Sequence, residues 1–167
     1  MKKLIIALLL VCSVGTINGQ TKIAHVNSQV LLDTMPSRRA AIIKLQEFES
    51  AGRNELQEMQ ADFEKSYNVF MANQSTWSPV ILKIEEEKLM KKQQNLQERE
   101  QSLQQEMQVY SQELNNPILE MVQKAVKEVS EKNKINYVID ESVTMYFAGG
   151  TDITKEVITV LLRMDQQ

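Results

Sequence analysis

Residues 73–79 read NQSTWSP, and they interrupt an otherwise continuous helical pattern. The Ser78 hydroxyl can accept hydrogen bonds from the backbone amides that follow it, and Pro79 suits the first position of a helix, where no amide donor is needed. This polar segment is typical of a turn that joins two helices. We therefore predict an antiparallel helical hairpin whose tip lies near residues 73–79.

The chain upstream of this turn is compatible with one helix from Ser37, a plausible N-cap, to about Asn73. Within it, apolar or small residues recur at spacings of three, four and four, an eleven-residue repeat of about 3.67 residues per turn. The stripe consists of Leu45, Phe48, Gly52, Leu56, Met59, Phe63, Tyr67 and Phe70. Such a stripe barely drifts around a straight helix, so tight left-handed supercoiling is not required.

The chain downstream of the turn repeats an apolar residue at every seventh position, from Leu82 to Tyr110. A stable coiled coil needs two apolar residues per heptad, so this seam predicts a marginally packed, bendable hairpin. The spacing becomes richer beyond Leu103, at Met107, Tyr110, Leu114, Ile118, Met121, Ala125 and Val129. Pro117 lies inside this pattern, and we expect a kink there or a restart capped by Asn116.

Short strand-like segments flank the helices. Residues 22–27 predict a strand that an Asn27-Ser28 turn closes, and residues 29–35 predict a short helix that Pro36 interrupts. Near the C-terminus, residues 137–139 and 143–148 predict a two-stranded hairpin around a polar turn. Gly149-Gly150 then breaks the pattern, and Thr154 is expected to cap a final helix buried through Val157, Ile158, Leu161 and Leu162.

The predicted fold is α+β and mostly α. Residues 45–107 form the hairpin arm, or tentacle, and residues 20–44 and 108–167 form a small β-containing body. Three short strands leave two unpaired edges and bury little area, so we expect the body to close by oligomerisation. The residues expected in this association body are Ile23, Val26, Tyr137, Val138, Ile139, Tyr146 and Phe147.

The first 19 residues are typical of a cleaved secretory signal peptide. Lys2 and Lys3 precede an apolar run, residues 4–11, that is too short to cross a bilayer. Lipidation of Cys12 is the alternative, but Val11 is larger than the residue that such sites prefer. Cleavage after Gly19 would remove the single cysteine and change the formal charge from −3 to −5. An acidic chain of this kind is a poor partner for nucleic acid.

We find no constellation that predicts catalysis, a cofactor or a bound metal. His25 is the single histidine, and without cysteine its metal-binding partners could only be carboxylates, so packing in the body is the favoured interpretation. The Asp140-Glu141 pair is explained by a polar turn. Gly149-Gly150 lacks the lysine and hydroxyl residue of a phosphate loop. The chain is therefore not expected to be an enzyme.

Three blocks carry a resemblance to a known family. They are residues 22–29 with Met35-Pro36; Pro117-Ile118, Ala125-Val126, Val129 and residues 136–140; and residues 152–154 with Val157-Ile158. Together, and in this order, they resemble the Skp/OmpH family over nearly the whole mature chain.

The resemblance implies a periplasmic homotrimer with a small β-barrel body and three helical tentacles around a central cavity. It also implies that unfolded outer-membrane β-barrel proteins are held in this cavity without ATP. Well-known members are basic, whereas this mature chain is acidic. The charge therefore does not support contact with anionic membranes or lipopolysaccharide.

Apolar side chains of the arm are the candidates for contact with such clients. They are Phe63, Tyr67, Phe70, Met71, Trp77 and Met90, and methionine suits a promiscuous surface because it is flexible and polarizable. Packing between the helices is the alternative for Phe63 and Tyr67, whereas the tip is expected to be too narrow to bury Trp77. A coiled-coil spacer or adaptor is the alternative function, although it would need a denser seam.

Overall fold

A computed structural model describes residues 21–166 of the chain. The predicted signal peptide and Cys12 lie outside these residues. The fold is mostly helical with one small sheet, and the chain divides into two compact units. We call the unit that contains residues up to Met35 and from Met121 onward the body, and the unit Pro36–Glu120 the arm.

The body contains a three-stranded sheet in which β1 (Ile23–Val26) lies between β2 (Tyr137–Asp140) and β3 (Thr151–Asp152). Both neighbours run parallel to β1, with Ile23 opposite Tyr137 and Ala24 opposite Thr151. The order β2-β1-β3 leaves one edge of β2 and one edge of β3 without a partner in this sheet.

The predicted C-terminal β-hairpin was wrong. Residues 141–143 form a 3₁₀ turn, η1 (Glu141–Val143), and residues 144–150 are not a strand. Asp140 caps η1, since its Oδ1 accepts from the Ser142 amide at 3.0 Å, and this cap turns the chain away from β2. Strand propensity depends on a neighbour that covers the side chains, and none of residues 21–166 covers Met145 or Tyr146 in this way.

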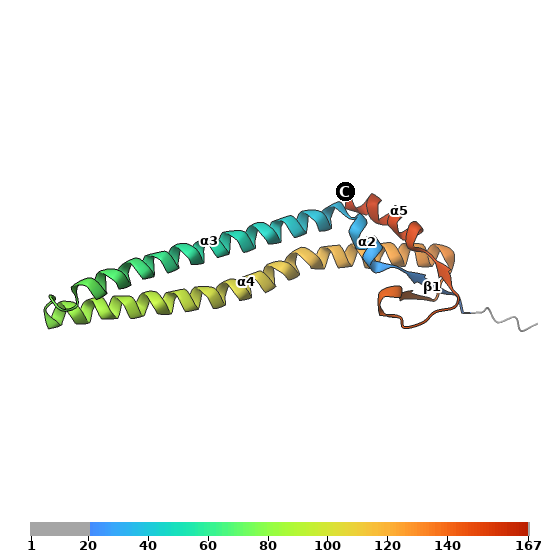
Figure 1. Cartoon of the computed structure of the whole chain (residues 1–167). Coiled ribbons are helices and arrows are strands. Elements are labelled where there is room, and N and C mark those ends of the chain that lie inside the picture. The colour runs from blue at the N-terminus through green and yellow to red at the C-terminus, as the bar shows by residue number, and fades with distance from the viewer. Residues whose placement is uncertain (1–20, 167) are drawn as a thin grey trace, which may run out of the picture. The chain divides into compact units, whose positions relative to one another are not determined.

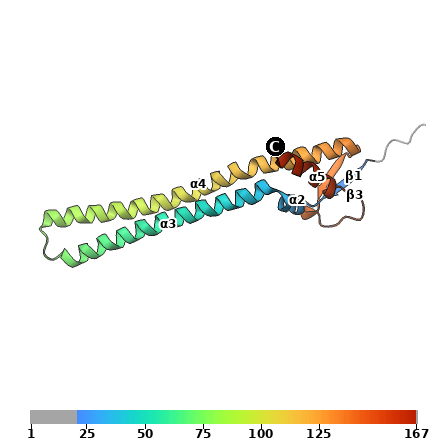
Figure 2. The ribbon, with the colours of Figure 1, turned by 90° about the horizontal axis from the view of Figure 1, so that it is seen from above.

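Helices cover one face of the sheet and form the core of the body. Figure 1 shows α2 (Ser28–Thr34), α5 (Thr154–Asp165) and the last turns of α4 (Pro79–Asn133) gathered beside β1, and Figure 2 shows the same grouping from above. The largest fully buried side chains in residues 21–166 are Leu31, Met35, Val129, Ile153, Val157 and Leu161. Ala24 and Val26 of β1 are buried on this face. Because strand residues alternate, Ile23 and His25 lie on the opposite face.

Two predicted helix caps were wrong. Helix α3 (Pro36–Asn73) begins at Pro36 rather than after Ser37, because proline is well suited to a first helical position. Helix α5 begins at Thr154, with no side-chain bond from its cap residue, Ile153. Asp152 caps the helix instead, because its Oδ1 accepts from the Thr154 amide at 2.9 Å. The Thr154 hydroxyl, which was expected to cap the helix, accepts from the Asn27 amide at 3.1 Å.

The arm is a helical hairpin made of α3 and α4 up to Glu120. Both views show the two helices side by side, joined at the green end of the arm (Figures 1 and 2). Helix α3 ends at Asn73, and Ser78 caps α4 as predicted, because its Oγ accepts from the Ile81 amide at 3.4 Å.

Of the two outcomes expected at Pro117, a kink or a restart, the restart did not occur. Helix α4 runs through this residue as one element of 55 residues. Proline removes one amide donor, but Pro117 and Glu113 are both exposed, so water can satisfy the carbonyl that loses its partner. A continuous helix is therefore tolerated at this position.

The facing sides of α3 and α4 carry the two predicted stripes. Every residue of both stripes is at least half-buried except Tyr67, which is 46% exposed while Ser66 is half-buried in its place. In α4, the position three residues after each seam leucine from Leu82 to Leu103 also faces α3 and is half-buried. It is charged in every heptad: Glu85, Lys92, Arg99 and Glu106. The seam therefore alternates apolar and charged layers.

Candidate functional site

Exposed apolar side chains gather within about two helical turns of the arm's loop. We call them the tip patch: Tyr67, Val69, Met71, Val80, Ile81 and Ile84. Val80 is 69% exposed, and each of the others is more than two-fifths exposed. Soluble monomers rarely expose many large apolar groups in one region without a binding role. The tip patch is therefore the first candidate site.

The six arm residues selected from the sequence do not share one environment. Phe70 and Trp77 are half-buried and pack edge to face across the loop, with ring centroids 6.0 Å apart. Phe63 is half-buried and stacks on the exposed Tyr67, with centroids 6.3 Å apart. Met71 and Met90 are exposed. A partner can thus meet Tyr67, Met71 and Met90 directly, whereas Trp77 also holds the loop against α3.

Four members of the tip patch were missed in the sequence: Val69, Val80, Ile81 and Ile84. A signal was present, because Val80-Ile81-Leu82 is an apolar run and only one of three consecutive helical positions can face the partner helix. Leu82 occupies that position and is half-buried. Its two neighbours must therefore face solvent.

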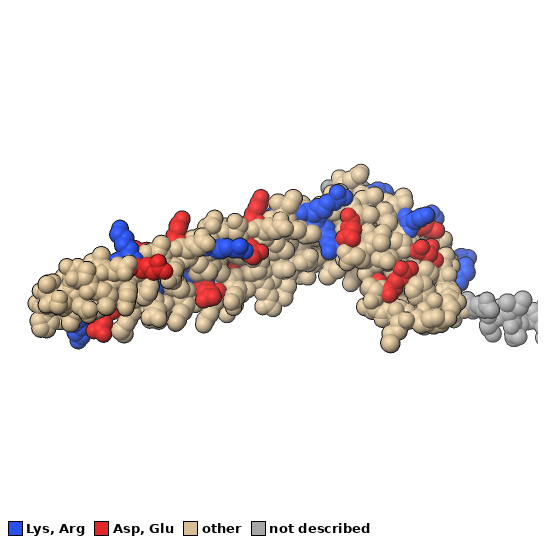
Figure 3. Space-filling view, viewed as in Figure 1, with Lys and Arg blue, Asp and Glu red and all other residues tan. Residues whose placement is uncertain are grey.

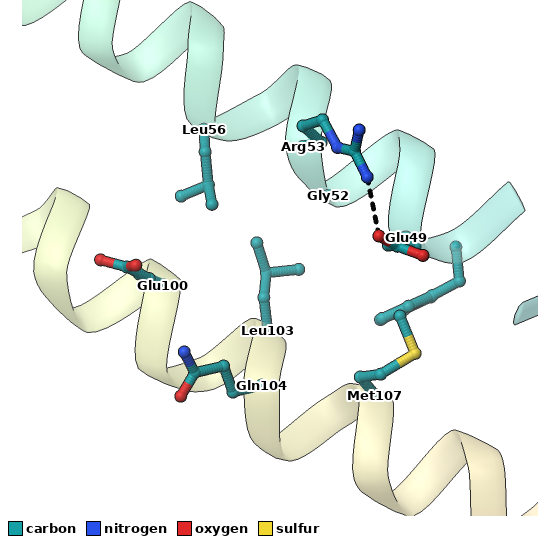
Figure 4. A pocket seen from close by; sticks show the side chains of 9 residues that line it. Glu49, Gly52, Arg53, Leu56, Glu100, Leu103, Gln104 and Met107 are labelled. Atoms are coloured by element: carbon teal, nitrogen blue, oxygen red, sulfur yellow. Dashed lines mark hydrogen bonds and ion pairs between the residues drawn. The ribbon is translucent and has the colours of Figure 1, made fainter. Parts of the chain in front are cut away.

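A groove runs along the middle of the arm between α3 and α4 (Figure 4). Its volume is about 560 Å³, and Leu56, Leu103 and Met107 point into it. Gly52 lies opposite Leu103, and a Cβ at this position would lie 3.1 Å from the Leu103 Cδ2 atom. Glu49 and Arg53 form an ion pair of 2.7 Å at the rim. The groove is apolar in its floor and holds no group arranged for chemistry.

Ion pairs link the two helices of the arm at two levels. Arg99 donates to both carboxylate oxygens of Glu55 at 2.8 and 2.9 Å, and to Glu106 at 2.7 Å. Hydrogen bonds from Arg99 to Glu55, and from Ser102 and Arg99 to Glu106, hold the pKa of both carboxyl groups below the ordinary value. Lys92 pairs with Asp62 and also donates to Ser66 at 2.7 Å. Charged residues at seam positions specify register while lowering stability.

The second candidate site is the face of the sheet that the helices leave uncovered. We call it the free sheet face. It consists of Ile23 and His25 of β1 and of Tyr137 and Ile139, which lie opposite them on β2. Tyr137 is 63% exposed, and Ile23 and Ile139 are at least two-fifths exposed. Val26 is buried, and Val138 lies opposite the buried Ala24, so these two predicted association residues face the chain's own core. Phe147 packs on the His25 ring, with centroids 4.8 Å apart.

A polar network ties η1 to the start of α2. Glu141 bonds the His25 Nδ1 atom through Oε1 at 2.6 Å, and its Oε2 accepts from the Asn27 side chain at 3.1 Å. Asp140 accepts from the Ser28 amide at 3.3 Å. Burial alone would raise the pKa of Asp140, but hydrogen bonds from Ser28 and Ser142 together bring it below the ordinary value. His25 is thus held by a carboxylate and positions no nucleophile.

The charges visible on the surface are mixed. Lys and Arg side chains alternate with Asp and Glu side chains on the face shown in Figure 3, with no continuous band of one sign. A nucleic-acid site requires clustered positive charge, which this face does not offer. Among residues 21–166, none of the helices combines the length and apolar character of a membrane span.

A small α+β body with a parallel sheet and a long helical hairpin define a class of arm-bearing proteins. Comparison with known proteins specifies the class further. Residues 22–161 match the model of the family described as outer membrane protein, OmpH-like. The Chaperone protein Skp of Yersinia pseudotuberculosis is 37% identical over 145 residues, covering 86% of this chain and 87% of that protein.

Two further relatives agree with this match. The Chaperone protein Skp of Photorhabdus laumondii is 29% identical and covers 95% of this chain and 98% of that protein. An OmpH-like crystal structure from Caulobacter crescentus CB15 has the same fold, with a TM-score of 0.75 at 17% identity, and covers 90% of this chain and 89% of that chain. The chain belongs to the Skp/OmpH-like chaperone family.

Proposed function

We propose that this chain is an ATP-independent holding chaperone of the periplasm, which binds unfolded outer-membrane β-barrel proteins and prevents their aggregation. The tip patch is the observation that carries the proposal. An unfolded chain offers apolar segments of no fixed shape, and exposed Val, Ile, Met and Tyr side chains on a hairpin can contact them without a preformed pocket. The charged layers of the arm seam support the proposal, because a weakly packed hairpin can bend around clients of different size.

We propose further that the protein assembles as a homotrimer through the body. Parallel sheets are normally covered on both faces, yet the free sheet face exposes Ile23, Tyr137 and Ile139. Both outer strands have unpaired edges, and the adjoining residues Tyr146 and Phe147 are exposed. Contact with neighbouring copies would cover these side chains and pair the edges. The number three comes from the family resemblance.

Shortening the arm tests client holding. Replacing residues 65–87 with a short turn removes the loop and the whole tip patch but leaves the body intact. We expect unchanged oligomer mass, weaker suppression of aggregation of an unfolded β-barrel protein, and no effect of ATP on either protein. If the shortened protein protects the client as well as the full one, the adaptor function becomes the better explanation.

Point substitutions make the test more specific. The triple change Val80→Ser, Ile81→Ser and Ile84→Ser should weaken protection while helicity is retained. A matched control replaces three exposed polar residues of the same helix, Gln93, Gln97 and Gln101, with serine. Equal loss of protection in both variants would contradict a role for the tip patch.

Native mass spectrometry tests the assembly. The mature chain should give a trimer at micromolar concentration, and Ile139→Asp should give a folded monomer, because the new carboxylate would have to be buried without a partner. Val138→Asp is the contrasting variant and should unfold the body itself. A stable monomer from the unsubstituted chain would overturn the trimer.

Intact-mass analysis of exported protein then checks cleavage after Gly19 and the absence of lipid.

A further inference from the structure

The only histidine of the chain lies beside two carboxylates that are distant in the sequence. His25 comes from β1, Glu141 from η1 and Asp152 from β3, and one ligand atom from each of them lies within 4.8 Å of the others. The sequence alone offered no partner for His25, because Glu141 is 116 residues away along the chain. The parallel pairing of β1 with both neighbours brings the three side chains together.

Contacts around the cluster orient its donor atoms. The Asn27 side chain holds one oxygen of Glu141 at 3.1 Å, and the Thr154 amide holds one oxygen of Asp152 at 2.9 Å. The other oxygen of Glu141 bonds the His25 Nδ1 atom at 2.6 Å, and Asp152 keeps its other oxygen for a further partner. Surrounding hydrogen bonds of this kind orient the ligands of protein metal sites.

The backbone also leaves room around the imidazole. Gly150 has a φ of +98°, and a Cβ there would lie 3.3 Å from both the His25 Cδ2 atom and the Ile23 carbonyl oxygen. A side chain at this position would press on the ring. Phe147 lies against the ring, so an apolar group shields one side of the cluster from water.

The carboxylates of the cluster outnumber its imidazole. Two carboxylates face one imidazole, and among residues 21–166 neither carboxylate forms an ion pair with a lysine or arginine, although hydrogen bonds from Thr154 and the charge of Lys155 help to lower the pKa of Asp152. One imidazole nitrogen and two carboxylate oxygens form a ligand set that suits Zn²⁺ and related transition-metal ions.

We propose that His25, Glu141 and Asp152 form a site for one divalent transition-metal ion, with Zn²⁺ as the best match. Two ligands of one Zn²⁺ ion are at most about 4.2 Å apart, so a small rotation of the exposed Asp152 side chain brings the cluster within range. The ion takes the place of the hydrogen bond between the His25 Nδ1 and Glu141 Oε1 atoms, which are 2.6 Å apart and separate to bind it. Solvent completes the coordination, as in sites with three protein ligands.

Metal titration of the full mature chain tests the site. Protein stripped with a chelator is titrated with Zn²⁺ in a calorimeter and with Co²⁺ by visible absorption. We expect one ion per chain and a higher melting temperature. His25→Ala should abolish stoichiometric binding, and Asn27→Ala should weaken it about tenfold through the lost hydrogen bond to Glu141.

Asp152→Asn is the decisive variant because it preserves the fold. Asparagine keeps the oxygen that accepts from Thr154 but loses the charge, so the metal-free body should stay folded and melt only slightly lower, while Zn²⁺ binds at least about tenfold more weakly. Glu131→Gln, an exposed carboxylate of the body paired with Lys127, is the matched control and should bind normally. Absent or non-stoichiometric binding, or binding that Asp152→Asn leaves unchanged, would overturn the proposal.

Discussion

The body and the arm bury their side chains in different ways. The largest fully buried side chains of the described residues, such as Leu31, Val157 and Leu161, all belong to the body. The arm is longer in sequence, yet most of its seam is only half-buried, with charged layers between the leucines. Stability is therefore concentrated in the small unit, and the long unit remains free to deform. Local unfolding should begin where buried apolar contacts are few.

Removing buried volume should separate the two units most clearly. Leu161→Ala in the body should lower the free energy of unfolding by about 2–5 kcal/mol, because its side chain is fully buried. Leu96→Ala in the arm seam should cost about 1 kcal/mol, since Leu96 is half-buried. Urea unfolding followed by circular dichroism at one protein concentration checks both. Equal losses would mean that the arm holds a core as well packed as that of the body.

Acid should weaken the body through its polar network. Hydrogen bonds hold the folded pKa of Asp140 below the unfolded value of about 3.9, so its carboxylate contributes stability above that value and loses the contribution as pH falls through the folded pKa. Asp140→Asn should cost about 1 kcal/mol at neutral pH and flatten this acid dependence. Melting temperatures between pH 7 and about pH 3 test this, with Asp33→Asn on α2 as the control. An unchanged acid slope in Asp140→Asn would contradict it.

Gly52 tests how closely the helices of the arm approach. Leucine at this position would collide with Leu103 and should push α3 and α4 apart locally, which the distance between spin labels on the two helices would report. Gly52→Ala should change stability by less than about 1 kcal/mol, because the better helix propensity of alanine offsets the 3.1 Å contact with a flexible leucine methyl. In both variants the body should melt as before. A large loss from Gly52→Ala would show that Leu103 cannot move.

The smallest effect is expected from Arg99. Arg99→Gln removes the bonds to Glu55 and Glu106, and it should slightly lower the helicity of the arm at low salt and make little difference at high salt. In the unsubstituted chain, acid should reproduce this loss, because both carboxylates have a lowered pKa and are protonated as pH falls through it. Arg53→Gln, whose partner Glu49 lies on the same helix, is the control. Identical salt dependence in the two variants would show that Arg99 does not tie α3 to α4.

The sequence predicts the hairpin well because its signals are local. The turn at residues 73–79, the Ser78 cap and both stripes are visible within a few helical turns, and the structure confirms them. The sheet was harder to predict, because residues 143–148 have strand propensity but gain no strand partner among residues 21–166. The charged layers at Lys92 and Arg99 were predicted only as a seam with one apolar residue per heptad, without their ion pairs to the facing helix. Likewise, the partners of His25 depend on strand pairing across more than a hundred residues.

The two repeats of the arm have a mechanical consequence. An eleven-residue stripe favours right-handed winding and a seven-residue stripe favours left-handed winding, so the two stripes do not favour one common supercoil of α3 and α4. The two helices lie side by side instead, linked by the ion pairs Glu55–Arg99 and Asp62–Lys92. Two helices that can shift along each other bend easily, and every ion pair between them adds stiffness. The number and strength of these ion pairs therefore set how far the arm bends under an applied force.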